Sequence, residues 1–185
     1  MNILFSRLVC LIGFVMLCNA TLEAQPITLR KGTVVIVRHA EKGKGNDPAL
    51  TDTGLLRSYE LYNWFMKNRI KPGQVYVSQY KRTRQTADSV VNAFGSRVIQ
   101  YKADEKAQAL RGELLKNLKG SQDILIVGHS NTVPDILRLF GISSYPGEIP
   151  DAEHDNLFLI RFKKGKAKFL HIKYGNPALL KQDSM

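Results

Sequence analysis

The chain of 185 residues contains little cysteine, and both of its cysteines, Cys10 and Cys18, stand near the N-terminus. A domain that begins after Ala24 therefore has no disulfide bond and no thiolate for catalysis or zinc binding. Acidic residues are also scarce, with 16 Asp and Glu against 27 Lys and Arg, so the net charge is +11. This excess of positive charge favours anionic partners, but it says nothing about the fold.

A long hydrophobic run is also missing. The apolar stretch LVCLIGFVML, over residues 8–17, has ten residues, whereas a transmembrane helix needs about 20. Arg7 precedes this stretch, and the small residues Ala20 and Ala24 follow it. This order of a positive charge, a short apolar run and small residues is typical of a secretory signal peptide.

We therefore expect a signal peptide over residues 1–24, cleaved after either alanine, and a single domain over residues 25–185. The expected location is exported, either periplasmic or secreted, with no stable membrane insertion after cleavage. An uncleaved anchor is one alternative. A lipoprotein acylated at Cys18 is another, and Leu17 weakens it because it stands where a small residue is usual.

Short apolar runs alternate with amphipathic stretches in the rest of the chain. Runs such as TVVIV and DILIV are continuously apolar, which is typical of parallel strands buried on both faces. The last two runs flank a turn with a glycine, so they are expected to pair as a hairpin. The expected strands are 33–37, 74–78, 97–101, 123–127, 156–162 and 168–174, and the expected helices are 51–67, 83–94, 106–118 and 133–140.

Strands that alternate with helices predict right-handed crossovers. The expected fold class is α/β with three layers, α/β/α: a mostly parallel sheet with helices on both faces and an antiparallel C-terminal hairpin at the edge. In the first helix, we expect Leu55, Leu61, Tyr62 and Phe65 to face the sheet. Ligands in such folds bind beyond the carboxyl ends of the strands, which directs attention to the polar residues there.

Polar side chains gather after three expected strands. Arg38 and His39 follow the first, SQYKRTRQTA (78–87) follows the second, and GHSNTVP (128–134) follows the strand that ends at Val127. Two histidines with several arginines and no acidic cluster make a poor metal site, so no metal and no cofactor is expected. The same groups suit a phosphate dianion, because guanidinium groups match its oxygens and neutral imidazole is a good nucleophile.

The segments VRHAEK, SQYKRTRQTA and GHSNTVP, in this order and each after an expected strand, resemble the histidine phosphatase superfamily, also called the phosphoglycerate mutase-like fold. The resemblance is to small bacterial members without large insertions, and it covers nearly all of residues 33–175. The family commonly has an RHG motif, and this chain has Ala40 in place of the glycine.

The resemblance implies a role for each residue of the three segments. His39 would be the nucleophile that becomes phosphohistidine. Arg38 and Arg82 would hold the phosphoryl oxygens, and His129 would form a hydrogen bond with one of them. Charge stabilisation and positioning of this kind are what phosphoryl transfer mainly requires.

The resemblance says less about the general acid that protonates the leaving oxygen. Larger members place a Glu or Asp after the third strand, where this chain reads QYKADEKAQ. Asp104 is the first candidate there and Glu105 is the second. Glu153 and Asp155, in the loop after the GHSNTVP helix, are alternatives.

Other polar residues near these segments have simple structural interpretations. Lys42 and Asn131 are candidate ligand contacts, but a solvated lysine and a helix cap are the simpler roles. Ser78 is expected to form a strand-end hydrogen bond, and Arg84 to be exposed or ion-paired. His154 could touch the substrate from the rim, although a surface histidine is the simpler expectation.

Together these features predict an exported phosphoric monoester hydrolase that acts on a small phosphorylated substrate without a metal. A non-catalytic module that binds a phosphorylated ligand is one alternative, and a phosphotransferase resembling phosphoglycerate mutase is another. The two motif histidines argue against the first, and the short chain leaves little room for the substrate-binding segments of the second. Nucleic-acid binding has only the net charge in its favour, and the sequence leaves the oligomeric state open.

Overall fold

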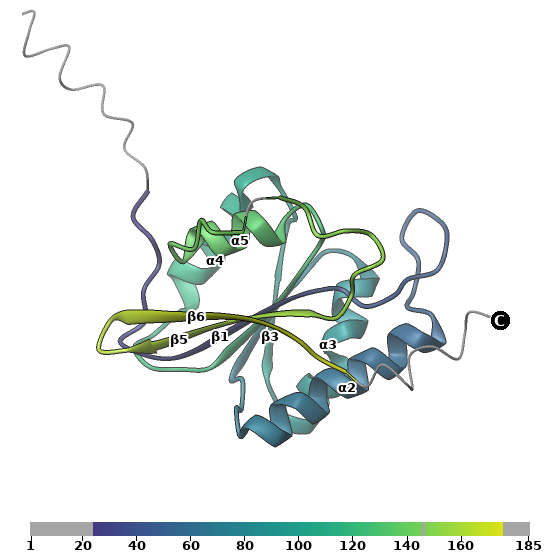
Figure 1. Cartoon of the computed structure of the whole chain (residues 1–185), viewed down its shortest axis with the longest axis horizontal. Coiled ribbons are helices and arrows are strands. Elements are labelled where there is room, and N and C mark those ends of the chain that lie inside the picture. The colour runs from purple at the N-terminus through teal and green to yellow at the C-terminus, as the bar shows by residue number, and fades with distance from the viewer. Residues whose placement is uncertain (1–23, 146, 176–185) are drawn as a thin grey trace, which may run out of the picture.

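The computed structural model describes residues 24–145 and 147–175, so the expected signal peptide and both cysteines lie outside the described residues, apart from Ala24. Within this part, no helix is long and apolar enough to cross a membrane. The chain forms one six-stranded sheet covered by helices (Figure 1). In chain order the elements are β1 (Lys31–Arg38), α2 (Asp52–Asn68), β2 (Gln74–Ser78), α3 (Lys81–Phe94), β3 (Arg97–Tyr101), the 3₁₀ helix η1 (Glu105–Ala107), α4 (Gln108–Asn117), β4 (Ile124–Gly128), α5 (Val133–Leu139), β5 (Asn156–Lys163) and β6 (Lys166–Lys173).

The strands of the sheet follow the order β3-β2-β4-β1-β5-β6. The first four run parallel, whereas β5 pairs with β1 in the antiparallel direction and β6 pairs with β5 in the same way. This arrangement confirms the expected α/β fold with its antiparallel hairpin at the edge. Because β1 and β4 are neighbours in register, their carboxyl ends, Arg38 and Gly128, lie side by side.

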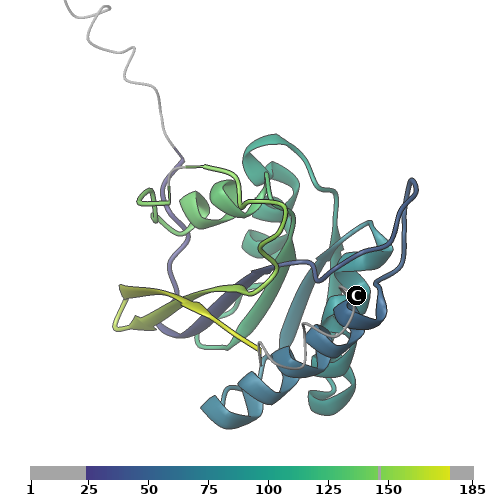
Figure 2. The same cartoon turned by 45° about the vertical axis from the view of Figure 1, so that its right-hand side comes forward.

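The central strands are buried on both faces because their apolar residues are continuous. In β1, Val34 and Ile36 belong to one hydrophobic cluster, and Val35 and Val37 belong to the other. Helices α4 and α5 cover the first face, and α2 and α3 cover the second (Figure 2). The sheet is therefore a rigid middle layer that holds the ends of its strands in place.

Helix α2 packs on the sheet through a narrower face than the sequence suggested. Leu61 and Phe65 are fully buried, as expected, but Leu55 is 49% exposed, so its assignment to the inner face is wrong. Gly54 lies on the inner face instead, because a Cβ at this position would come within 2.1 Å of the carbonyl oxygen of Glu41. The loop that follows β1 thus passes directly against the start of α2.

The expected helix over 106–118 begins later than the pattern predicted. Lys106 and Ala107 have φ angles of 55° and 50°, a left-handed backbone that an α-helix cannot contain. Both residues belong to η1, and their backbone keeps η1 from continuing directly into α4, which starts at Gln108. The segment before the break approaches the carboxyl ends of the strands, where it contributes to the site described next.

Candidate active site

A cavity of about 640 Å³ opens beyond the carboxyl ends of β1 and β4. Arg38 and His39 enter it from the end of β1, and His129 enters it from the residue after β4. Arg82 enters it from the first turn of α3. Three segments that are far apart in the sequence therefore meet in one cavity, as the strand-end rule predicts.

The imidazole of His39 is held in one tautomer. Its Nδ1 lies 2.8 Å from the carbonyl oxygen of Ala40, and because a carbonyl only accepts, Nδ1 carries the proton and donates it. The backbone N–H of His39 donates to the carbonyl of Gly128 at 2.9 Å, which extends the pairing of β1 with β4. With Nδ1 occupied, Nε2 is the nitrogen with a free lone pair.

Both histidines of the cavity are neutral at pH 7. Burial lowers the pKa of His39 to about 3, against the hydrogen bond to Ala40, and the neighbouring His129, Arg82 and Arg38 lower it further. Burial lowers the pKa of His129 to about 4, and the two arginines act in the same direction. The lone pair on Nε2 of His39 is therefore available for attack at neutral pH.

A chain of hydrogen bonds orients His129. Arg82 can only donate, and its Nη2 lies 3.3 Å from Nδ1 of His129, so Nε2 carries the proton and donates to Ser78 Oγ at 2.9 Å. Ser78 Oγ lies 3.0 Å from Thr83 Oγ1, whose own proton goes to the Tyr80 carbonyl at 2.8 Å. Ser78 therefore orients the imidazole ring of His129, a role that its position at the end of a strand does not indicate in the sequence.

Two threonines hold the backbone beside the histidines. Thr86 accepts from the N–H of Ala40 at 2.9 Å, and its hydroxyl donates to the carbonyl of Arg82 at 2.7 Å. Thr132 is at the N-cap position of α5, but its hydroxyl accepts from the N–H of His129 at 3.0 Å rather than capping the helix. The rings therefore project from backbone that is itself tied to α3 and α5.

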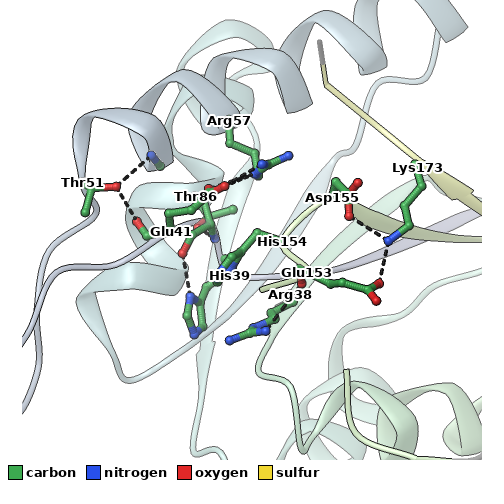
Figure 3. Close-up of polar contacts among 12 residues, drawn as sticks. Arg38, His39, Glu41, Thr51, Arg57, Thr86, Glu153, His154, Asp155 and Lys173 are labelled. Carbon is green, nitrogen blue, oxygen red and sulfur yellow. Dashed lines mark hydrogen bonds and ion pairs between the residues drawn. The ribbon is translucent and has the colours of Figure 1, made fainter. Parts of the chain in front are cut away.

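His154 lies beside His39, although 115 positions separate them in the chain (Figure 3). Its Nδ1 donates to the backbone carbonyl of His39 at 2.8 Å, and the ring centroids are 5.8 Å apart. His154 is half-buried, and burial lowers its pKa. The simpler sequence interpretation, a surface histidine, gave no sign of this contact, because only the pairing of β5 with β1 brings the two residues together.

An ion pair supports the loop that follows His39. Glu41 accepts from Arg57 Nε at 2.8 Å and from Nη2 at 2.5 Å (Figure 3). Burial alone would raise the pKa of Glu41, but the hydrogen bonds and charge of Arg57 outweigh it and lower that pKa. Arg57 is itself only 6% exposed and belongs to α2, so the pair joins this helix to the residues just after His39.

The guanidinium of Arg38 is held by the loop before β5. Its Nη1 donates to the carbonyl of Pro150 at 2.8 Å, and its Nη2 donates to the carboxylate of Asp151 at 3.1 Å. The Nε groups of Arg38 and Arg82 are buried and have no partner within the described part of the chain. Buried donors without acceptors are unfavourable. An oxyanion bound in the cavity would supply acceptors for the guanidinium groups of these two arginines.

Four further candidates from the sequence also line the cavity: Lys42, Asp104, Glu105 and Asn131. Asp104 accepts the N–H of Ala109 with Oδ2 at 3.0 Å, whereas its Oδ1 is buried without a partner among the residues described. Glu105, Lys42 and Asn131 are exposed. Asp104 is therefore the candidate acid whose carboxyl group the structure holds in place, through the N–H of Ala109.

Glu153 and Asp155 point elsewhere. Both carboxylates bind the ammonium group of Lys173, at 2.6 and 2.8 Å (Figure 3). Neither residue is among those that line the cavity in the described chain. Arg84 is half-exposed and pairs with Asp88 at 2.8 Å, in keeping with the expectation of a surface ion pair.

Comparisons with known proteins concern the family and the fold of the chain. The sequence model of the histidine phosphatase superfamily (branch 1) matches residues 30–106. The matched range includes Arg38, His39, Arg82 and Asp104, and it ends before His129. No curated protein sequence matches the chain.

Solved structures share the fold over most of the chain. A Nakamurella multipartitia protein provisionally designated phosphohistidine phosphatase SixA has a TM-score of 0.60 and 17% identity, over 81% of this chain and 100% of its own. A protein histidine phosphatase SixA complexed with tungstate has a TM-score of 0.55 and 18% identity, over 80% and 99%. Phosphoserine phosphatase from Entamoeba histolytica, in complex with 3-phosphoglyceric acid, has a TM-score of 0.53 and 14% identity, over 80% and 99%.

The resemblance to the histidine phosphatase superfamily is therefore confirmed, by the family model over residues 30–106 and by the fold over about four fifths of the chain. The identities to the solved structures are low, so these structures establish the fold and leave the substrate to be argued from the site itself.

Proposed function

We propose that the protein is an exported phosphatase that hydrolyses a phosphate monoester, or a similar small phosphorylated compound, through a phosphohistidine on His39. The observation that carries the proposal is the tautomer of His39, with Nδ1–H held by Ala40 and the lone pair left on Nε2. The neighbours that are named as phosphatases support it, and one of them binds tungstate, a tetrahedral oxyanion like phosphate.

In the first step, Nε2 of His39 attacks phosphorus while the bond to the leaving oxygen breaks. The ring then carries a positive charge, which the carbonyl of Ala40 stabilises through the proton on Nδ1. Arg38 and Arg82 would surround the phosphoryl oxygens, where negative charge accumulates in the transition state, and His129 lines the same cavity. Ser78 is a positioning residue, because it keeps the ring of His129 in place.

Asp104 is our proposed general acid. It lines the same cavity, and the N–H of Ala109 holds one of its oxygens while the other has no partner among the described residues. The acid would give its proton to the leaving oxygen. In the second step it would take a proton from the water that attacks phosphorus, as the bond to Nε2 breaks and phosphate leaves. Glu105 is the second candidate.

No metal is part of the proposed mechanism. Two guanidinium groups line the cavity and would repel a cation, and residues 24–145 and 147–175 contain no group of three or more His, Cys, Asp or Glu that could hold one. Export is proposed from residues 1–24 of the sequence. The mass of the protein purified from its native cell envelope tests it: loss of 20 or 24 residues is expected, and an intact N-terminus would contradict it.

The direct test is turnover of a chromogenic aryl phosphate, with and without a chelator, by the wild type and by His39→Ala. We expect wild-type turnover in both conditions and none from the variant. Trapping with labelled substrate should give an acid-labile phosphoprotein only in the wild type. Phosphate binding by both proteins without turnover would instead support a binding module, and loss of turnover with the chelator would refute the metal-free mechanism.

The assignment of the acid has its own test. Asp104→Asn should slow an alkyl phosphate by about 10²-fold or more and should barely slow an aryl phosphate with a good leaving group. The matched variant Glu105→Gln should affect both substrates little. Equal slowing of both substrates by Asp104→Asn would remove this residue from the role.

A further inference from the structure

A second charged surface lies at the other end of the sheet, around a groove of about 870 Å³. Seven cations line it, from the start of β1, the end of β5, the hairpin turn and the start of β6, and all seven are exposed. Among the lining residues of this groove, Asp123 is the one carboxylate. We call the cations the basic face: Arg30, Lys31, Arg161, Lys163, Lys164, Lys166 and Lys168.

The register of the sheet places these cations against one another. Lys163 stands directly opposite Lys31 on one side and Lys166 on the other, and Arg161 stands opposite Lys168. Residues that are directly opposite in antiparallel strands point to the same side, and like charges in such positions are destabilising. No ion pair to any of the seven occurs within the described ranges of the chain. The fold therefore retains an arrangement that weakens it.

Protection of an exposed strand edge explains only part of this arrangement. Lysines on an edge strand prevent unwanted pairing, and β6 is the edge strand, so Lys166 and Lys168 could serve that purpose. However, β1 and β5 are paired on both sides. Lys31, Arg161 and Lys163 lie on these inner strands and need another reason.

The shape of the surface indicates what kind of partner fits it. The cations on β1, β5 and β6 lie on the same side of the sheet as α2 and α3. The turn end of the hairpin extends beyond these two helices in both views (Figures 1 and 2). Leu170 follows Lys166 and Lys168 on the same side of β6 and is 40% exposed. The result is an open sheet surface with spread positive charge and one apolar side chain at its border.

We propose that the basic face docks the protein, without insertion, on the anionic headgroups of a membrane. Cations spread over an open face fit a layer of mobile headgroups, and each is worth about five-fold in binding near an anionic bilayer. Nucleic acid fits less well. The aromatic residue of the groove, Phe162, is 3% exposed and cannot stack on a base, and a sheet of this width does not enter a groove of duplex DNA.

Docking in this way leaves the catalytic cavity free. Lys31 and Arg38 are at opposite ends of β1, which places them about 23 Å apart at the rise of a strand. The cavity therefore lies outside the docked surface and stays accessible to soluble substrates. The inference is independent of the proposed function, because it concerns residues that take no part in the cavity.

Vesicle flotation tests the proposal, with phosphatidylcholine vesicles that contain about 30% phosphatidylglycerol and with pure phosphatidylcholine as reference. We expect the wild type to bind the anionic vesicles and to be released as salt rises to about 0.5 M, where screening is nearly complete. The triple variant Lys163→Gln/Lys166→Gln/Lys168→Gln should bind about a hundred-fold more weakly. Its aryl phosphatase activity should equal that of the wild type.

A matched variant, Lys67→Gln/Lys71→Gln/Lys119→Gln, removes the same charge from exposed positions outside the basic face. It should retain binding to within about five-fold, and equal weakening of both variants would overturn the proposal in favour of net charge alone. Binding that is indifferent to lipid charge and salt would also overturn it, as would tighter binding to a DNA oligonucleotide than to vesicles.

Thermal unfolding gives a second readout. Because the triple variant removes three like-charge pairs, we expect it to melt about 1–4 °C higher than the wild type. The matched variant should melt at the wild-type temperature. A lower melting temperature for the basic-face variant would contradict the premise that these cations are held against repulsion.

Discussion

The two buried histidines of the cavity should make the stability of the protein fall steeply in mild acid. His39 and His129 have pKa values of about 3 and about 4 in the folded state, against 6.5 for an exposed histidine. At a pH between the folded and the unfolded pKa values, the two histidines are protonated in the unfolded chain and neutral in the folded chain. The contribution of the pair is therefore complete above pH 6.5 and is lost as the pH falls toward the folded pKa values.

The size of this loss in stability follows from how far the pH lies below the histidine pKa of the unfolded chain. At pH 4.5 an unfolded histidine is about two pH units below its pKa, and each unit is worth about 1.4 kcal/mol. Each buried histidine then lowers the free energy of unfolding by about 2–3 kcal/mol relative to pH 7.5, and the pair lowers it by about 5 kcal/mol. This loss is comparable to the whole stability of a marginal domain.

The assay is urea unfolding at pH 7.5 and pH 4.5, followed by the fluorescence of Trp64. The comparison protein is His39→Asn/His129→Gln, whose amides stay neutral and retain the donors toward Ala40 and Ser78. Carboxylates titrate alike in both proteins, so the wild type should lose about 5 kcal/mol more than the variant on acidification. If both lose the same amount, the histidines are not held neutral by burial.

Further predictions concern residues that support the site. Ser78→Ala should lower kcat for the aryl phosphate about ten-fold with little change in KM, because His129 loses its orienting partner, and Ser78→Thr should restore part of it; an unchanged kcat would exclude the positioning role. His154→Ala should lower kcat by a similar factor, and His154→Asn, which keeps a donor for the carbonyl of His39, should retain most of the wild-type kcat. If His154→Asn is as slow as His154→Ala, the hydrogen bond to His39 has no role in catalysis. Gly54→Ala should destabilise the protein by about 2 kcal/mol or more in urea unfolding, because the added Cβ would come within 2.1 Å of the carbonyl oxygen of Glu41. A change below about 0.5 kcal/mol would refute that close contact.

The secondary structure was predictable because its signals are local. The runs TVVIV and DILIV predicted buried strands since continuous apolar residues need cover on both faces. Errors arose where a neighbouring segment decided the outcome. Leu55 has the right spacing for the inner face of α2, but Gly54 is the residue that lies against the carbonyl oxygen of Glu41, and Leu55 is exposed. The start of α4 moved because Lys106 and Ala107 adopt a left-handed backbone, which their residue types do not suggest.

The catalytic candidates were predictable for a different reason. Arg38, His39, Arg82 and His129 stand just beyond the ends of expected parallel strands, and parallel strands present their carboxyl ends at one edge of a sheet. The same rule is silent about His154, which precedes an antiparallel strand. It is equally silent about the bond between Ser78 and His129, which depends on β2 and β4 being neighbours.

The amino-acid sequence by itself determined the strands and helices, the segments that carry chemistry, and the excess of positive charge, because these depend on residue type and short-range spacing. Tertiary structure decided which nitrogen of His39 is free, which side chains hold His129, and which carboxylates reach the cavity. It also gathered scattered lysines into the basic face by setting β1, β5 and β6 in register. The physical reason is that hydrogen-bond partners, burial and opposed charges are properties of neighbours in space, and only the folded sheet determines those.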